Sequence, residues 1–295
     1  APSPSRTSYP EQMKFIVSEL KSFLAEHCVK VAPDGTFAVK FVKGDVKAGT
    51  ENSKLKEEAY SLRVTSGGAL ITAMDTRGFY YGMKTLEQLL LRRGGTTTIA
   101  ACDIVDWPDF EIRGFMNDVG RNYMPLPLIA RELDSMAQLK LNVYHFHFTE
   151  NPGWRLESKI YPELNAPENY TRMPGKFYTQ KEFKQLVEYC RLRNILLIPE
   201  MDMPGHSQMF RKALNVKMSD EKATKALVAL IKELCSLVPK EKMPIIHIGT
   251  DEVRGKDEQV NNEILKEYIH AVEFCGRIPM RWQPGLTPKG YNGSI

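Results

Sequence analysis

The sequence predicts an α/β protein with two parts, a small α+β domain over residues 1–107 and a (β/α)8 barrel of the TIM type over residues 108–295. After Trp107 and Pro108, apolar β runs alternate with amphipathic helices, which is typical of a parallel sheet. Each of these runs also ends in polar residues, and a barrel gathers such ends on one face, whereas an open sheet spreads them along a line. The chain holds five such runs, so we expect it to contain about five of the eight barrel strands.

The first domain has a helix and strand pattern of its own. Apolar residues recur at a spacing of three and four in one segment, which predicts an amphipathic helix, and polar and apolar residues alternate in others, which predicts strands with one buried face. We therefore expect helices that cover one side of a sheet. The predicted helices are 11–30 and 78–93, and the predicted strands are 36–42, 60–65, 69–74 and 96–107.

The second domain repeats one strand and one helix. The segment 195–198 is continuously apolar, as expected of a strand that is buried on both faces. Thr179 and Glu182 have the spacing of a capping box at the start of a helix. The predicted strands are 110–118, 142–150, 195–202, 244–252 and 278–284, and the predicted helices are 126–140, 180–192, 221–237 and 258–274.

Two adjacent carboxylates, Asp251 and Glu252, end the fourth strand of this series. Neighbouring residues on an ideal strand point to opposite faces, so both side chains can share one pocket only where the strand bends into a loop, and Gly249 permits such a bend. Alone, the pair would be explained by helix capping and solvation. The other four strands also end in polar residues, which favours a shared site. These residues are Asn117 and Asp118, Thr149 to Asn151, Glu200 and Asp202, and Trp282 and Gln283.

Two further features allow more than one interpretation. His145 and His147 lie two apart and therefore on one face of a strand, where they are either hydrogen-bonded core histidines, which we favour, or metal ligands completed by Asp251 and His206. Arg113 lies in an apolar β run, and a buried guanidinium needs a partner. That partner is either a protein carboxylate or the hydroxyls of a polar substrate.

Composition narrows the classes of function. Basic residues number 40 and acidic residues 36, spread without a dense block of one sign, which disfavours nucleic acid as a partner. No window approaches the roughly 20 apolar residues of a membrane span. Ala1 and the small residues after it fit either the end left by signal-peptide removal or a chosen boundary. The expectation is an exported protein, in the periplasm, at the cell surface or secreted.

Several long motifs, in order, resemble glycoside hydrolase family 20, the β-N-acetylhexosaminidases. They are "GFYYGMKTLEQLL", "IRGFMNDVGRNYMP", "LNVYHFHFTENPGWRLESKIYPEL", "IPEMDMPGHS" and "HIGTDEV". The resemblance covers nearly all of the chain from about residue 55. It implies a retaining exo-glycosidase that removes terminal β-linked N-acetylglucosamine or N-acetylgalactosamine and needs no cofactor and no metal.

The resemblance also implies roles for individual residues. Glu252 would be the general acid and base, and Asp251 would orient the substrate's own 2-acetamido group, whose oxygen attacks the anomeric carbon. In most glycosidases the separation of two carboxylates predicts whether the anomeric configuration is retained or inverted. That rule does not apply to this substrate-assisted mechanism. Arg113 would bind ring hydroxyls, Trp282 would wall the pocket, and His206 and Glu150 would support the acid.

The chain departs from the family pattern at three positions. Glu150 and Asn151 stand where two aspartates are usual, and Thr250 stands where a glycine is common. They leave open a second hypothesis, a member of the family that binds sugars with impaired catalysis. A third is a metal-dependent hydrolase that uses His145 and His147. The resemblance further implies that the last barrel strands, a tyrosine that contacts the acetamido group and more tryptophans lie beyond Ile295.

Overall fold

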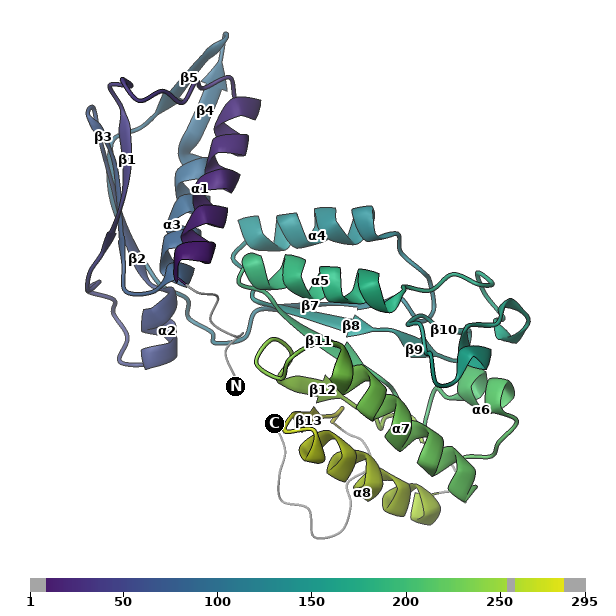
Figure 1. Ribbon diagram of the computed structural model, residues 1–295. Coiled ribbons are helices and arrows are strands. Elements are labelled where there is room, and N and C mark those ends of the chain that lie inside the picture. The colour runs from purple at the N-terminus through teal and green to yellow at the C-terminus, as the bar shows by residue number, and fades with distance from the viewer. Residues whose placement is uncertain (1–8, 254–257, 284–295) are drawn as a thin grey trace.

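Two separate sheets organise the chain (Figure 1). The structure is a computed structural model that describes residues 9–253 and 258–283. The segment after Ala1 that predicted export and the last residue of the predicted strand 278–284 lie outside the described residues.

The first sheet has four strands in the order β1–β3–β2–β6. One of its faces buries the apolar sides of the helices α1 (Tyr9–Glu26) and α3 (Thr76–Leu89), as the alternating pattern predicted. Ile16 and Leu20 of the first helix and Phe79 and Met83 of the second are buried there. The strands are β1 (Ala38–Lys43), β2 (Tyr60–Thr65), β3 (Gly68–Ala73) and β6 (Cys102–Asp106).

Two predictions for this part are corrected, and one element is added. The helix predicted at 78–93 ends at Leu89, because the next four residues form β4 (Leu90–Arg93) and pair with β5 (Thr96–Ile99). The strand predicted at 96–107 is therefore two strands in different sheets. A short helix that the sequence analysis missed, α2 (Ser53–Glu58), begins after Asn52, whose side chain accepts a hydrogen bond from the backbone N–H of Lys54.

The second sheet has five parallel strands in chain order along the sheet, β7–β8–β11–β12–β13. All five were predicted; the first begins later than predicted but ends at the predicted residue, Asp118, and the other four end earlier than predicted. The four predicted helices follow them, and the capping box of Thr179 and Glu182 at the second of these helices is confirmed. The strands are β7 (Gly114–Asp118), β8 (Val143–His147), β11 (Leu196–Glu200), β12 (Ile245–His247) and β13 (Ile278–Met280), and the helices are α4 (Leu126–Gln138), α5 (Gln180–Leu192), α7 (Glu221–Leu237) and α8 (Glu258–Phe274).

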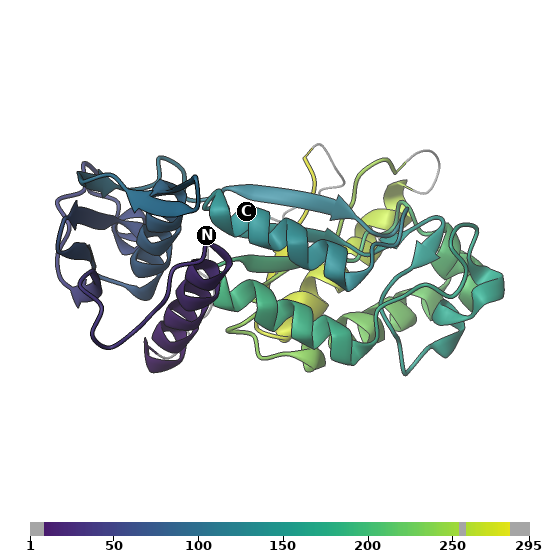
Figure 2. The same cartoon turned by 90° about the horizontal axis from the view of Figure 1, so that it is seen from above.

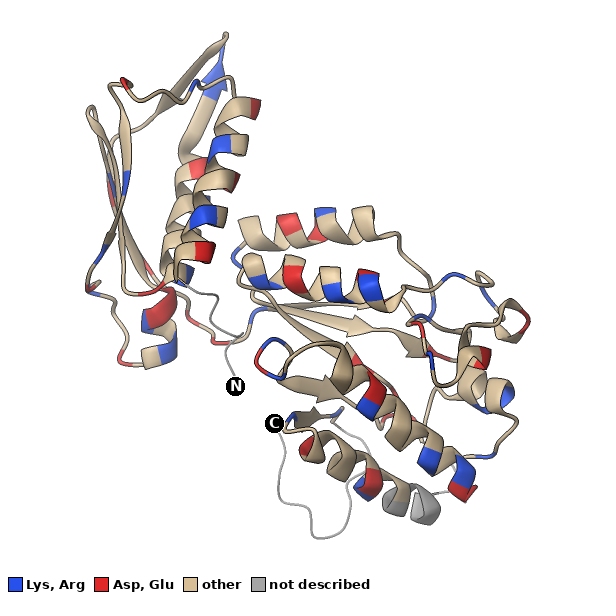
Figure 3. Ribbon diagram, in the orientation of Figure 1, with Lys and Arg blue, Asp and Glu red and all other residues tan. Residues whose placement is uncertain are grey.

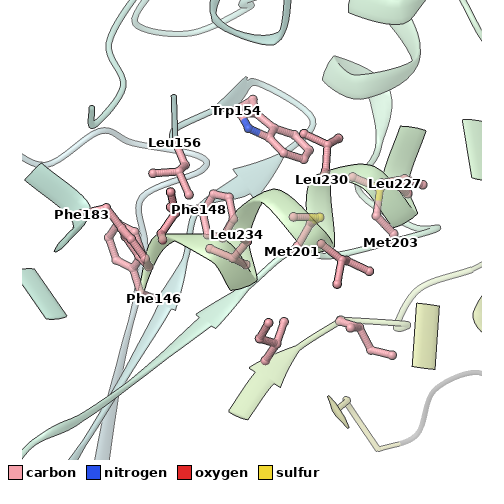
Figure 4. Packing of buried hydrophobic residues seen from close by; sticks show 14 of the residues in the cluster. Phe146, Phe148, Trp154, Leu156, Phe183, Met201, Met203, Leu227, Leu230 and Leu234 are labelled. Carbon is pink, nitrogen blue, oxygen red and sulfur yellow. The ribbon is translucent and has the colours of Figure 1, made fainter. Parts of the chain in front are cut away.

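The two faces of this sheet differ. One face packs against all four helices and forms the main core, which includes Leu197 and Leu230, and Figure 4 shows Phe146 beside Phe183 in it. Along the other face, a small apolar cluster around Leu196, Ile198 and Ile245 occupies the amino half. The carboxyl half of that face carries His145, His147, Glu200 and His247. The polar residues therefore gather towards the ends of the strands.

Short elements that the sequence did not predict surround the carboxyl ends of the strands. In Figure 2 they form the teal and green segments at the end of the molecule opposite the first domain. Trp154, at the end of one of them, is buried against Phe148 and Phe210. These elements are β9 (Thr149–Glu150), β10 (Gly153–Trp154), the 3-10 helices η1 (Pro162–Asn165) and η2 (Pro167–Asn169), and α6 (Gln208–Leu214).

The two sheets meet at the amino ends of the second sheet's strands. Arg113, directly before β7, lies 2.5 Å from Glu58 of α2, and Asn142 donates to the same carboxylate. Lys140 lies 2.7 Å from Asp106 of β6. Charged residues of both signs are interspersed over the outer helices (Figure 3). Among the described residues, no helix has the length and apolarity that crossing a membrane requires.

Candidate active site

One level of the second sheet sets the position of the site. Asp118, His147, Glu200, His247 and Met280 are paired with one another across all five strands. Because the strands are parallel, the loops that follow these residues all begin at the same end of the sheet, the carboxyl end of its strands. The segments that carry Glu150, His206 and the adjacent carboxylates Asp251 and Glu252 are therefore brought together.

The backbone bends sharply between β12 and the two carboxylates. Gly249, Thr250 and Glu252 all have positive φ, at 68°, 88° and 50°. A Cβ built on Gly249 would lie 1.7 Å from the Oδ1 of Asp202, so only glycine fits this conformation and this approach. The predicted bend is confirmed. Thr250 is a β-branched residue in a region that such residues rarely adopt, and its buried Oγ1 finds no partner among the described residues.

His206 connects the carboxylates on either side of it. Its Nδ1 contacts Glu150, and its Nε2 lies 3.2 Å from Glu252 and 4.0 Å from Asp251. The hydrogen bond with Glu150, which outweighs the effect of burial, raises the pKa of His206 to about 9. An imidazolium at neutral pH is therefore placed between Glu150 and the acidic pair.

The loop before His206 approaches the acidic turn closely. A Cβ on Gly205 would lie 2.5 Å from the backbone oxygen of Asp251, so glycine is needed for this contact. On the other side, Glu150 is almost wholly buried and accepts the backbone N–H of Asn151. Burial opposes its ionisation, but the bonds from His206 and Asn151 prevail and lower its pKa. Glu150 therefore carries the negative charge that keeps His206 protonated.

Asp202 supports the same turn from β11's side. Its Oδ1 accepts the backbone N–H of Thr250 at 3.2 Å, and its own backbone N–H donates to the hydroxyl of Thr149 at 2.9 Å. Burial, together with the charges of Glu200 and Asp251, raises the pKa of Asp202 to about 8. A largely neutral carboxyl at this position limits the repulsion that the site would otherwise build up.

Arg121 is a residue of the site that the sequence analysis missed. It follows the end of β7, and its guanidinium lies 2.6 Å from both Asp118 and Glu150 while half of the side chain stays exposed. The signal was present, because an arginine three residues after a strand end lies in the loops that carry function in such folds.

Arg113 does not belong to the site, and its predicted role in binding the sugar is corrected. It precedes the first residue of β7, whereas Asp118 ends that strand, and five residues of β-strand span about 16 Å. Its guanidinium pairs with Glu58 and donates to the backbone oxygens of Phe110 and Lys140. Of the two partners that the sequence allows for Arg113, the structure thus contains the protein carboxylate, Glu58, at the junction of the two sheets.

Trp282 and the two strand histidines share another carboxylate. His145 and His147 lie 2.7 and 2.6 Å from Glu200, which confirms that they are on one face and supports the reading as hydrogen-bonded core histidines. The indole of Trp282 stacks on His145 at 5.3 Å between ring centroids. Trp282 lies beside the acidic turn, because its backbone N–H donates to the oxygen of Gly249 at 3.0 Å.

Some of these side chains have the residue types of a metal site. In the part of the chain that the structure describes, three groups bring possible ligand atoms within 4.8 Å of one another. They are His145, Glu200 and His247; His147, Glu200 and Asp202; and Asp202, His206 and Asp251. Two of the three sets contain Glu200, whose contacts of 2.6 and 2.7 Å with histidine nitrogens are hydrogen-bond distances. Ligands around a common zinc would stand farther apart, so the observed arrangement fits hydrogen bonding better.

Comparisons with known proteins agree on one family. The profile of the glycosyl hydrolase family 20 catalytic domain matches residues 110–219, and the profile of domain 2 of the same family matches residues 5–107. The β-hexosaminidase of Porphyromonas gingivalis is 39% identical over 166 residues, which are 52% of this chain and 21% of the relative. The β subunit of human β-hexosaminidase is 30% identical over 227 residues, covering 70% and 40% of the two chains.

Solved structures share the fold. The chitobiase of Flavobacterium johnsoniae superposes with a TM-score of 0.79 at 26% identity, over 95% of this chain and 49% of that one. The N-acetyl-β-hexosaminidase of Streptomyces plicatus superposes with a TM-score of 0.82 at 22% identity, over all of this chain and 65% of that one, and shows the fold alone. The chain spans less than half the length of the curated relatives named above.

Proposed function

Because the chain belongs to glycosyl hydrolase family 20, we propose that the protein containing it is an exo-acting β-N-acetylhexosaminidase. Its substrates would be glycans or chitin-type oligosaccharides that end in β-linked N-acetylglucosamine or N-acetylgalactosamine. The relatives carry the corresponding names. The alternative of a metal-dependent hydrolase has less support, because hydrogen bonding accounts for the positions of His145 and His147.

The observation that carries this proposal is the chain of contacts from Glu150 through His206 to Glu252. A general acid must hold a proton, release it, and be restored. His206 lies 3.2 Å from Glu252, and its positive charge would stabilise the carboxylate that remains after the proton has left. Glu252 is 63% exposed, so its carboxyl group is open to a substrate oxygen.

Retention of configuration follows from two displacements. In the first, Glu252 protonates the glycosidic oxygen while the carbonyl oxygen of the 2-acetamido group attacks the anomeric carbon, so the aglycone leaves and an oxazolinium forms. In the second, Glu252 takes a proton from water and the water oxygen attacks the anomeric carbon. The bond from that carbon to the acetamido oxygen breaks, so the oxazolinium ring opens. Asp251 would accept the acetamido N–H and stabilise the positive charge. This is the substrate-assisted exception to the two-carboxylate mechanism.

Binding of the sugar ring would use the open side of the same site. The guanidinium of Arg121 is half exposed and fixed by Asp118 and Glu150, so it can donate to ring hydroxyls without losing its partners. Trp282 offers an apolar face beside the acidic turn, and sugar rings bury their C–H faces on aromatic side chains. We assign the hydroxyl-binding role to Arg121 in place of Arg113.

Two broader expectations remain proposals. In the protein that contains this chain, the five parallel strands would form part of a closed (β/α)8 barrel. Reading the coding sequence past Ile295 tests this. Export to the periplasm, the cell surface or the medium is tested by fractionating cells and assaying each fraction.

The function is tested with the full-length protein and two aryl glycosides. We expect hydrolysis of aryl β-N-acetylglucosaminide with retention, seen by following the anomeric proton by NMR. The matched control is the aryl β-glucoside, which lacks the acetamido nucleophile and should react at least about 10³-fold more slowly. Equal rates on both substrates would refute the substrate-assisted mechanism, and no hydrolysis of either would refute the activity.

One observation favours a second candidate, a family member that binds sugars with impaired catalysis. Thr250 has a φ of 88° beside Asp251, where a side chain is costly. If this residue distorts the turn, Thr250→Gly and Glu150→Asp should raise kcat by more than 10-fold while the affinity for N-acetylglucosamine stays within about 3-fold. Calorimetric titration with that sugar separates binding from turnover.

A further inference from the structure

Glu200, the last residue of β11, is a charged residue that the mechanism above does not use. Its carboxylate is fully buried, and four nitrogen atoms surround it. Oε2 lies 2.7 Å from Nε2 of His145 and 2.6 Å from Nδ1 of His147. Oε1 lies 3.0 Å from Nδ1 of His247 and accepts the indole N–H of Trp282 at 2.7 Å. A carboxylate has about four lone-pair directions, which equals the number of nitrogen atoms around it, and the contacts with His147 and Trp282 have hydrogen-bond geometry.

This carboxylate is ionised in the folded protein. Burial favours the neutral form, but the hydrogen bonds from the three histidines outweigh it and hold the pKa of Glu200 far below its usual range. In return, the contact with Glu200 raises the pKa of His147 despite burial. A buried carboxylate is tolerated only with such partners, which makes the charge and the positions of its neighbours interdependent.

Two of these neighbours lead directly to the acidic turn. Nδ1 of His247, besides its contact with Glu200, lies 3.1 Å from the backbone nitrogen of Gly249. One nitrogen cannot both donate to Glu200 and accept from Gly249, so we assign its proton to the shorter contact with the carboxylate. The backbone N–H of Trp282 donates to the oxygen of the same Gly249 at 3.0 Å. The hydrogen bond from Trp282 therefore reaches the turn two residues before Asp251, and His247 is joined to Gly249 through the chain itself, two residues apart.

The ring of Trp282 is held from the same centre. Its indole N–H is bonded to Glu200, and its rings lie against His145 and His247 at centroid distances of 5.3 and 4.8 Å. Loss of the carboxylate would therefore release the wall of the proposed sugar pocket and the support of the turn together.

We propose that Glu200 is a positioning residue whose charge holds the turn of residues 249–252 and the Trp282 indole in the geometry that Asp251 and Glu252 need. This inference rests on the proposed hydrolase function. It assigns a task to the carboxylate, which touches no substrate, and to the histidines around it, which act as its donors.

The test is Glu200→Gln in the full-length protein, with aryl β-N-acetylglucosaminide as substrate. The amide keeps the size of the side chain but replaces one acceptor oxygen with an N–H2 group, which faces two donors. The turn should shift on an ångström scale, so we expect kcat to fall about 100-fold while KM changes less than about 3-fold. The control is Glu87→Gln, a buried glutamate of α3 that pairs with Lys84 far from the site. It should leave both constants of the folded enzyme unchanged.

A second readout does not depend on turnover. Trp282 is one of three tryptophans in this chain, and the difference in emission between the full-length protein and its Trp282→Phe variant isolates the contribution of Trp282 from that of all other tryptophans. We expect Glu200→Gln to shift that emission, because the indole loses its ionic partner. Glu200→Asp keeps the charge but is shorter, so it serves as a better-folded variant and should lower kcat about 10-fold.

The outcomes separate the two proposals. Unchanged kcat and unchanged Trp282 emission in Glu200→Gln, with an active wild type, would overturn the positioning role and leave the hydrolase function intact. If Glu200→Gln lost activity only in proportion to its loss of folded protein, with the kinetic constants of the folded enzyme unchanged as in the control, the positioning role would be overturned as well. An inactive wild type whose Trp282 emission still shifts in Glu200→Gln would refute the hydrolase function while the role of Glu200 in holding the indole stands.

Discussion

The two ends of the five-stranded sheet are both rich in charged residues, but they use them differently. At the amino end, Arg113 and Lys140 are paired with Glu58 and Asp106, and the cleft of about 280 Å³ beside them is lined by groups that already have partners. At the carboxyl end, Glu252 is largely exposed and one oxygen of Asp251 is buried without a partner among the described residues. The difference teaches that unused bonding capacity, more than the presence of charge, distinguishes the end that we propose as the active site.

The largest difference is expected between two separate variants that carry the same change, glutamate to glutamine, one at each end of the sheet. Glu252→Gln should lower kcat/KM by about 10³-fold, because the proton donor is lost, with little change in stability. Glu58→Gln removes a carboxylate from the junction and should leave the kinetic constants of the folded protein unchanged while lowering its Tm. Rates on aryl β-N-acetylglucosaminide and thermal unfolding are the measurements. Unaltered activity of Glu252→Gln would refute its assignment as the acid.

The second comparison uses the two arginines that lie before and after β7, at opposite ends of the sheet. Arg113→Met should lower the free energy of unfolding by about 3 kcal/mol, because it leaves the part-buried Glu58 without its cation. Arg121→Met should cost less than about 1 kcal/mol, since that side chain is half exposed, but should raise KM. Urea unfolding and steady-state kinetics measure the two effects. Equal losses of stability would show that the ends are not distinct.

A smaller effect is expected at the acidic turn. Thr250→Gly should raise the free energy of unfolding by about 1 kcal/mol, because it relieves a β-branched residue at a φ of 88°. If the turn is already in its working geometry, kcat should change less than about 3-fold. A stability decrease would show that Thr250 is not strained. Ser66→Gly, in the exposed β2–β3 turn, is the control for the added flexibility of the unfolded chain.

The last comparison is a pH dependence of stability, which appears over only part of the pH range. His206 has a pKa of about 9 in the folded protein, against about 6.5 in the unfolded chain, so the folded state binds more protons between these values. The stabilisation from this proton is complete below about pH 6.5 and is lost as the pH rises through about 9. Urea unfolding of the wild type and His206→Gln from pH 6 to 9.5 should converge as the pH rises. Asp202 contributes in the same direction in both proteins, so the difference between them is the relevant quantity. Parallel curves would contradict the assignment.

The sequence determined the main elements of both sheets and the identity of the acidic pair. Hydrophobic periodicity is a local property, so the helices α5, α7 and α8 and the five parallel strands could be located from it. Gly249 also predicted the bend between β12 and the pair Asp251 and Glu252. Local capping rules likewise predicted the start of α5 at Thr179.

Only the tertiary structure decided which charged side chains meet. Arg113 and Arg121 lie in one stretch of sequence, but the strand between them places them at opposite ends of the sheet. There Arg113 pairs with Glu58 and Arg121 pairs with Glu150. The contacts of Glu200 with three histidines and of His206 with Glu252 join residues from separate strands and loops. A pattern along the chain records which residues are buried. The partners that satisfy them are set by the register between strands, which depends on the packing of the whole sheet.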